Sequence, residues 1–273
     1  MVKLLRFILV RVISRNSSAP HLSGDLFKSL TDFEFEENSN NTLTPPSAII
    51  FTNSLKMELL QKSQALETNR LTILAGNSDR DFDKNFDFSA IECDRIYVQN
   101  LLVPADEKIK VLPLGIENLR IGRNGIPLLF FRFFYRFPKR NKVLLGPISQ
   151  THNERIGLME EFSKNENVVC LTKFMNPLRY AFKSSRFKFI ACPRGNGVDT
   201  HRFWESLYRG GIPIVVRSAW SQNIRSLGIP LIEIESWSNG EINRVLASST
   251  PNFDPGNIPA LWEDYWKKEF KKS

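Results

Sequence analysis

The sequence predicts an α/β fold in which helices connect the strands of parallel sheets. Short runs rich in β-branched residues alternate with helical stretches, which is the pattern of a parallel sheet with crossover helices. This alternation stops near the middle of the chain and then starts again. With 273 residues, of which 42% are hydrophobic, the chain can bury a substantial core. We therefore expect two α/β halves, each with its own sheet, joined near residues 120–142.

The first half is expected to hold four strands and one helix. The expected strands are Ala48–Thr52, Leu71–Ala75, Arg95–Val98 and Ile109–Leu112, and the expected helix is Leu55–Leu66. Thr31–Ser47 is polar and contains a Pro-Pro pair, so it is expected to be a loop. Residues 1–13 are apolar but carry three basic residues and no small-residue cleavage site. A first strand or helix of the fold is expected there, rather than a membrane-spanning segment or a signal peptide.

The second half repeats the alternation. The expected strands are Val143–Leu145, Val168–Leu171, Phe187–Ala191 and Ile212–Val216, and the expected helices are Glu154–Phe162, Pro177–Ser184 and Asp199–Arg209. Near the end of the chain, Trp262, Trp266 and Phe270 follow one another at intervals of four residues. On a helix these three side chains share one stripe, so we expect a final helix that packs against another element.

Cysteine and histidine usage gives no indication of a metal site or cofactor. Cys93, Cys170 and Cys192 lack the C-x-x-C spacing of a zinc or redox site, and we expect reduced core residues. The chain has only three histidines, and no two of them are close enough in sequence to form a local metal motif. No bound cofactor and no dedicated metal are expected.

The chain is basic, with a formal net charge of +8 and a pI near 9.4, which suits polyanionic partners. Ile126–Phe137 (IPLLFFRFFYRF) lies in a stretch without acidic residues and carries two arginines four residues apart. Two interpretations stay open: an interdomain helix with its aromatics in the core, or an amphipathic helix on an anionic membrane surface. Nucleic acid is not an expected partner, because the aromatic run is too continuous for a solvated stacking platform.

Phe187–Val216 is the most informative stretch for function. It reads as a strand, a glycine-containing loop, a helix and a second strand. Ligands of open parallel sheets bind beyond the carboxyl ends of the strands, where the loop Pro193–Gly197 falls. Glycines allow the backbone to approach an anion, and the N–H groups at the start of the next helix point toward it. The spacing matches neither the dinucleotide fingerprint nor the P-loop.

The helix after this loop carries a polar stripe that suits a nucleotide. Arg202 can donate a forked pair of hydrogen bonds to phosphate, and Glu205, one turn later, can accept from ribose hydroxyls. Asp199 is the expected N-cap. The structural alternative is that Arg194 and Arg202 are solvated or ion-paired with Asp199 and Glu205, as surface charges commonly are.

At these residues the chain resembles exostosin-like glycosyltransferases, the family 47 group. The resemblance covers Ser185–Val216: a Ser-x-Phe strand, a Pro-Arg-Gly loop, Asp, Arg and Glu on a helix, and a Gly-x-x-Pro turn. Weaker similarity extends to AGNSD (75–79), PLGIE (113–117) and THNER (151–155). The chain departs from the family in its short first half, which leaves the acceptor open.

The resemblance implies a GT-B-like enzyme with two Rossmann-like domains facing a cleft and no need for a divalent metal. The implied division is an acceptor-side domain at 1–125, a basic aromatic segment at 126–142 and a donor-binding domain at 143–273. Arg194 and Arg202 would hold the diphosphate of a UDP- or GDP-type donor, Glu205 the ribose, and Arg155 a second phosphate oxygen. The implied donor-site residues are Arg155, Arg194, Gly195, Asn196, Gly197, Asp199, His201, Arg202 and Glu205.

A transferase that inverts its substrate also needs a base for the acceptor hydroxyl. Asp79, after the strand 71–75, is the first candidate for the base, and Glu117 is the second. Asp79 in a turn-forming Asn-Ser-Asp run would alternatively only cap that turn. The leading hypothesis is thus a glycosyltransferase acting on a glycan or other hydroxyl acceptor. The first alternative is a non-catalytic nucleotide-sugar-binding subunit of a glycan-assembly complex, and the second, less favoured, is a basic nucleic-acid-binding protein. A cytoplasmic location is expected, with peripheral membrane attachment through Ile126–Phe137 left open.

Overall fold

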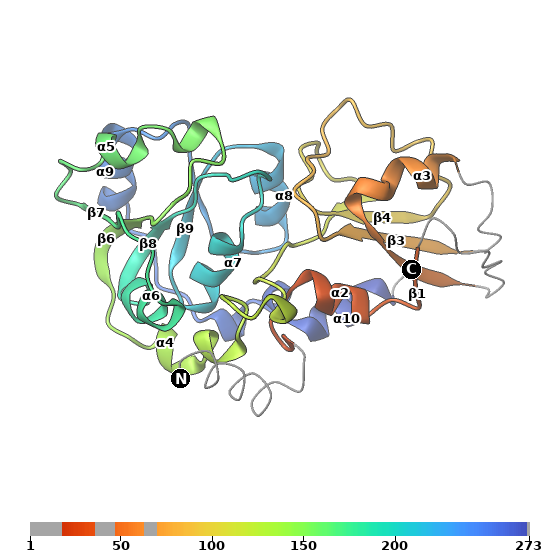
Figure 1. Cartoon of the computed structure of the whole chain (residues 1–273), viewed down its shortest axis with the longest axis horizontal. Helices are drawn as coiled ribbons and strands as arrows, with labels where there is room; N and C mark the ends of the chain where they lie inside the picture. The colour runs from red at the N-terminus through yellow and green to blue at the C-terminus, as the bar shows by residue number, and fades with distance from the viewer. Residues whose placement is uncertain (1–17, 36–46, 63–69, 272–273) are drawn as a thin grey trace.

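The computed structural model describes residues 18–35, 47–62 and 70–271, and Figure 1 shows their arrangement. Within these ranges the strands form two five-stranded sheets, in which every pairing is parallel. The strand orders are β1-β2-β3-β4-β5 and β10-β9-β8-β6-β7. The prediction of two α/β halves with parallel sheets is therefore confirmed. Residues 1–13, expected to form a first element, lie outside the described ranges.

The first sheet agrees closely with the expected strands and adds one more. Its members are β1 (Phe33–Glu34), β2 (Ala48–Asn53), β3 (Leu71–Gly76), β4 (Arg95–Val98) and β5 (Ile109–Val111). The expectation of an uninterrupted loop over Thr31–Ser47 is wrong, because β1 lies within it and pairs with β2 at the sheet edge. β1 has only two residues, both exposed, so it lacks the apolar run by which a strand is recognised.

The helical elements of the first half are short. α2 (Gly24–Ser29) begins at Ser23, whose hydroxyl accepts a hydrogen bond from the backbone N–H of Leu26. α3 (Met57–Lys62) follows a 3₁₀ turn at Ser54–Lys56. The turn and α3 together cover the described part of the expected helix Leu55–Leu66.

The second sheet contains β6 (Arg140–Leu145), β7 (Val168–Cys170), β8 (Phe187–Ala191), β9 (Ile212–Val216) and β10 (Ile232–Ile234). Its helices are α5 (Leu158–Glu161), α6 (Pro177–Ser184), α7 (His201–Tyr208), α8 (Ala219–Ser226) and α9 (Asn239–Ala247). The expected helix Glu154–Phe162 is broken into a 3₁₀ turn at Asn153–Arg155 and α5. Gly157 lies between the two with a φ of 76°, a left-handed conformation that interrupts a helix.

The segment Ile126–Phe137 is not one amphipathic helix, so that expectation is wrong. A 3₁₀ turn at Pro127–Phe130 ends at Phe131, which is extended (φ −63°, ψ 149°), and α4 (Arg132–Tyr135) follows. Because the extended residue changes the direction of the chain, the aromatic side chains do not share one face. Phe130 and Phe134 are buried, whereas Phe131 and Phe133 are exposed. The segment is therefore partly in the core and partly at the surface, and the contact with a membrane stays a prediction.

The last helix, α10 (Glu263–Phe270), returns from the second half to pack against the first (Figure 1). The ring centroids of Trp266 and Phe27 of α2 lie 5.5 Å apart, and those of Phe270 and Tyr97 of β4 lie 5.1 Å apart. Trp266 and Phe270 are buried, which confirms the predicted packing of this helix. The domain boundary implied at residue 143 therefore does not divide the chain cleanly. α10 lies after that boundary but completes the core of the first half.

The cysteines are unpaired: Cys192 is buried, whereas Cys93 and Cys170 are only half-buried. The expectation of reduced cysteines in the core is therefore met in full by Cys192 and only in part by Cys93 and Cys170. None of the helices described in Figure 1 has the length and apolar character needed to cross a bilayer.

Candidate functional site

A cavity of about 320 Å³ lies beyond the carboxyl end of β8 and is lined by both halves of the chain. The second half contributes the glycine loop, the first turns of α7, and segments that follow β6 and β7. The first half contributes Asp79, Leu114 and Asn124. The cavity therefore lies where a ligand of a parallel sheet is expected. Of the predicted site residues, all except Arg194 and Glu117 line it, namely Asp79, Arg155, Gly195, Asn196, Gly197, Asp199, His201, Arg202 and Glu205.

The two loop glycines pack closely against side chains from other segments. A Cβ on Gly195 would lie 3.0 Å from Nη2 of Arg155, and a Cβ on Gly197 would lie 2.6 Å from Oδ1 of Asn100. The N–H of Gly195 donates to the carbonyl oxygen of Gly197 at 3.0 Å, which closes the loop into a tight turn. Because the two glycines have no side chains, Arg155 and Asn100 can lie close to the loop, and a ligand could do the same.

Two guanidinium groups, of Arg155 and Arg202, face the cavity. Arg155 holds the loop by donating from Nε to the carbonyl oxygen of Arg194 (2.7 Å) and from Nη2 to that of Pro193 (3.0 Å). Arg202 donates to the carbonyl oxygen of Pro147, and its Cζ lies 5.8 Å from the centre of the Tyr180 ring. Burial, and then the charge of Arg202, lower the pKa of Arg155. The two cations thus repel each other across a cavity that would favour an anion.

Glu205 is buried and ion-paired, but its partner is neither Arg194 nor Arg202, the two arginines of the structural alternative. Its Oε2 accepts from Nη1 of Arg209, one turn later on α7, at 3.2 Å. Arg209 also donates from Nε to the carbonyl oxygen of Leu129, at 3.3 Å, and lies over the ring of Phe130. Because Arg209 neutralises Glu205, the positive charges of Arg155 and Arg202 are not offset by that carboxylate.

Asp199 is not the N-cap of α7, so that expectation is wrong. Thr200 holds the cap position, and the buried carboxylate of Asp199 accepts from the N–H of Leu114 (2.9 Å) and from Nε1 of Trp204 (2.7 Å). The backbone N–H of Asp199 donates to Oδ1 of Asn100 at 2.9 Å. Asp199 therefore joins the start of α7 to two segments of the first half. Burial raises the pKa of Asp199 to about 7, although these donors oppose the shift.

We expect replacement of Asp199 by asparagine to change how stability depends on pH. The pKa of Asp199 is about 7 in the folded chain and about 4 when unfolded, so between those values the folded state binds more protons. The contribution of Asp199 to stability is therefore present below about pH 4 and is lost as the pH rises through 7. Thermal unfolding of both proteins between pH 5 and pH 8 should show the Tm of the wild type falling relative to that of Asp199→Asn. A difference in Tm that stays constant with pH would contradict the raised pKa.

His201 links α7 to the first half at the edge of the cavity. Its Nδ1 lies 2.8 Å from the carbonyl oxygen of Gly115, which can only accept, so Nδ1 carries the hydrogen. Gly115 has a φ of 73°, and a Cβ there would lie 2.1 Å from the carbonyl oxygen of Leu22. A residue other than glycine would therefore displace the segment that holds His201.

The candidate bases lie in different places. Asp79 is exposed, lines the cavity, and accepts from Nδ2 of Asn196 at 3.1 Å. Glu117 does not line the cavity: its Oε1 accepts from the backbone N–H groups of Arg123 (3.2 Å) and Asn124 (2.7 Å), which stabilises a turn. The geometry therefore supports Asp79 rather than Glu117 as a group that could contact a substrate.

Arg194 does not face the cavity either. Its Nη2 donates to Oδ2 of Asp81, in the first half, at 2.6 Å. Asp81 also accepts from the N–H of Val198 at 3.3 Å, so a single carboxylate holds both ends of the glycine loop. Sequence reasoning missed Asp81, although it lies two residues after Asp79. Neither does any sequence signal identify Tyr180, Pro147 or Asn100, whose roles depend on contacts across the fold.

No family model matches this chain, and no curated protein matches it. The resemblance to exostosin-like glycosyltransferases therefore stays a prediction. Across the described ranges, no group of three or more His, Cys, Asp or Glu side chains is placed to hold a metal ion.

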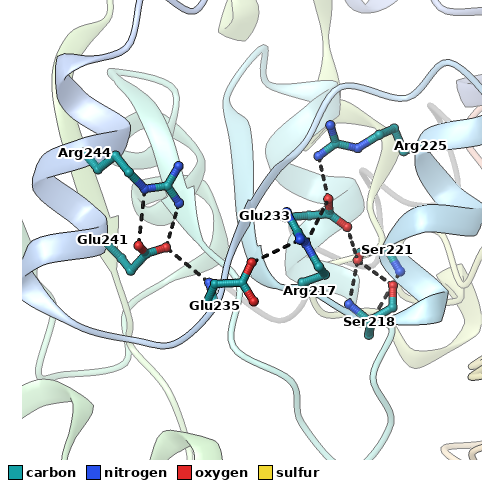
Figure 2. Close-up of polar contacts among 8 residues, drawn as sticks. All are labelled: Arg217, Ser218, Ser221, Arg225, Glu233, Glu235, Glu241 and Arg244. Atoms are coloured by element: carbon teal, nitrogen blue, oxygen red, sulfur yellow. Dashed lines mark hydrogen bonds and ion pairs between the residues drawn. The ribbon is translucent and has the colours of Figure 1, made fainter.

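A separate polar network lies at the carboxyl ends of β9 and β10 (Figure 2). Its centre is the almost fully buried Glu233, which accepts from the hydroxyl of Ser221 (2.6 Å) and pairs with Arg225 (3.0 Å). These contacts fix α8 to β10. On the same helix, Asn223 donates to the carbonyl oxygen of Val103 and accepts from the N–H of Ala105, both at 2.9 Å. None of these residues lines the cavity, and Asn223 joins α8 to the first half.

Proposed function

We propose that this chain is a glycosyltransferase that moves a sugar from a nucleotide-diphosphate donor to a glycan or other hydroxyl acceptor. The observation that carries the proposal is the pair Arg155 and Arg202, facing one cavity beside the glycine loop and the start of α7. Two parallel sheets with a cavity between them are compatible with a GT-B-like arrangement. In this arrangement the second half binds the donor, and the first half contributes to the acceptor side.

The proposed chemistry places positive charge where the leaving diphosphate develops negative charge. As the bond between the anomeric carbon and the phosphate oxygen breaks, Arg202 and Arg155 would stabilise the departing oxygens together with the N-terminal end of α7. The acceptor oxygen forms the new bond to that carbon and loses its proton to a base. Asp79 is the group we propose for this step, because it lines the cavity from the first half.

A second candidate is a nucleotide-sugar-binding subunit without catalysis. Its support is the carboxylate of Asp79, which is already hydrogen-bonded to Asn196, so the proposed base has a structural partner. Product formation by purified protein, tested against a panel of nucleotide sugars and glycan acceptors, separates the two. A protein that binds donors but yields no product would support the subunit.

Binding of a nucleotide diphosphate should raise the melting temperature of the protein. Ligand at about 100 times its Kd stabilises the folded state by about 2.7 kcal/mol. Thermal-shift measurements with UDP, GDP, CMP and ADP should show a larger shift for the three diphosphates than for CMP, because CMP carries one phosphate and uses fewer of the cationic contacts. If none of the four changes the Tm, the proposal of a nucleotide-sugar site fails.

A further inference from the structure

Exposed apolar side chains gather on α4, on the residue before it and on α6. Phe131 and Phe133 are 62% and 51% exposed, and Leu178 and Phe182 of α6 are 45% and 38% exposed. We call these four residues the aromatic patch. Large apolar side chains that are exposed together on a folded protein mark an interaction surface more often than isolated ones do.

A ring contact joins two members of the patch, Phe133 and Phe182, although they come from distant parts of the sequence. The ring centroids of Phe133 and Phe182 lie 6.0 Å apart, and Phe182 lies 5.2 Å from the buried Phe134. Phe133 also lies 4.7 Å from Phe137. Because Phe133 and Phe182 both contact the buried Phe134, these two rings form a supported surface rather than separate side chains.

Basic residues surround the patch, and acidic residues are absent from the segments that form it. Residues 118–153 and 167–198 together contain 13 Lys and Arg and no Asp or Glu, so the rest of the chain has a formal charge of −5. Arg136, Arg179, Lys183 and Arg186 are exposed. The Cζ of Arg186 lies 5.6 Å from the ring centre of Phe137, which places one of these cations beside the aromatics.

We propose that the aromatic patch binds the surface of an anionic lipid bilayer. Its apolar side chains would enter the interface, while the surrounding cations interact with acidic headgroups, each contributing about 1 kcal/mol near the surface. The rings pack edge to face, with interplanar angles of 72° for Phe133 and Phe137 and 80° for Phe133 and Phe182. This leaves no flat platform for stacked bases, which favours lipid over nucleic acid.

α6 also borders the cavity, because Pro177 and Tyr180 line it. The same helix therefore carries Leu178 and Phe182 toward the proposed membrane and two other residues toward the proposed donor site. Membrane binding is independent of whether the cavity performs glycosyl transfer, and it can be tested without any substrate.

Co-sedimentation with vesicles tests the proposal directly. The full chain should bind vesicles of phosphatidylcholine with phosphatidylserine, should bind vesicles of phosphatidylcholine alone much more weakly, and should be released as the salt concentration rises. The double variant Phe131→Ser/Phe133→Ser should bind about tenfold more weakly or worse. Its far-ultraviolet circular dichroism and Tm establish that it is folded. Unchanged binding by this folded variant would overturn the proposal.

Three further variants test whether the patch itself makes the contact. Leu55→Ser/Ile156→Ser removes two apolar side chains that are each 65% exposed but lie outside the patch, and it should bind as the wild type does. Arg136→Glu/Lys183→Glu keeps the aromatics and reverses two charges, and it should also lose binding. If the aromatic double variant does not fold, this charge variant decides the question. If Phe7→Ser/Leu9→Ser loses vesicle binding while the patch variants keep it, the membrane contact belongs to the N-terminal sequence. That result would overturn the proposal.

Discussion

Replacing Arg202 by alanine is expected to reduce turnover of the nucleotide-sugar donor by about 100-fold or more, as loss of one preorganised donor to a developing negative charge does in other enzymes. Arg202 faces the cavity from the first turn of α7, and its guanidinium is held by Pro147 and Tyr180. Initial rates with the nucleotide sugar whose nucleotide gives the largest thermal shift measure the effect. The fold should survive, since Arg202 is only half-buried.

Two variants make this experiment specific. Arg202→Lys keeps the charge but loses the forked pair of donors, so its rate should lie between those of the wild type and the alanine variant. Arg244→Ala removes an exposed arginine that pairs with Glu241 outside the cavity, and its rate should match that of the wild type. Turnover by Arg202→Ala within a few-fold of the wild-type rate would remove Arg202 from the proposed mechanism.

Replacing Trp266 by alanine is expected to lower the free energy of unfolding by about 3–5 kcal/mol, the usual cost of deleting a buried aromatic side chain. Trp266 is buried between Phe27, Tyr97 and Phe270, and its Nε1 donates to the carbonyl oxygen of Ala260 at 3.0 Å. The variant would leave a cavity at the contact between α10 and the first half. Urea unfolding, followed by circular dichroism, measures the loss.

The matched control lies on the exposed side of the same helix. Lys268→Ala has the same helical context, but its side chain is exposed, so it should change the unfolding free energy by less than about 0.5 kcal/mol. Similar losses in both variants would contradict the role of buried packing, because alanine favours a helix at both positions. A loss confined to Trp266→Ala would show that its packing against the first half carries the stability.

Strands and helices with a strong local pattern could be predicted from the sequence. α6 begins and ends where it was expected, because Asn176 accepts at its start and Pro177 occupies its first turn. β4 and β8 also match, because each is a short, mostly buried apolar run in a parallel sheet. The position of the candidate site followed from the same pattern, since the loop after β8 could be placed at the edge of its sheet.

The remaining features depend on contacts between distant residues. Aspartate at position 199, just before a helix, is a residue type that favours the N-cap. In the structure its carboxylate instead accepts hydrogen bonds from Leu114 and Trp204 in the interior. An arginine in a glycine loop is a typical phosphate ligand, yet Arg194 forms an ion pair with Asp81 of the other half. The partners of these side chains depend on the tertiary structure, which local sequence propensity does not predict. The break at Phe131 is of the same kind, because burial of Phe130 and Phe134 on either side of it is decided by the core.

The return of α10 also bears on how the chain folds during synthesis. Domains commonly fold in the order in which they leave the ribosome, beginning with the N-terminal one. Here Phe27 and Tyr97 are translated before the second half, but the aromatic rings of α10 that cover them are translated after it. The first half therefore completes its core only after the second has been made. Until then its apolar surface is open to chaperones, and a ribosome that stalls before Trp266 would leave it uncovered.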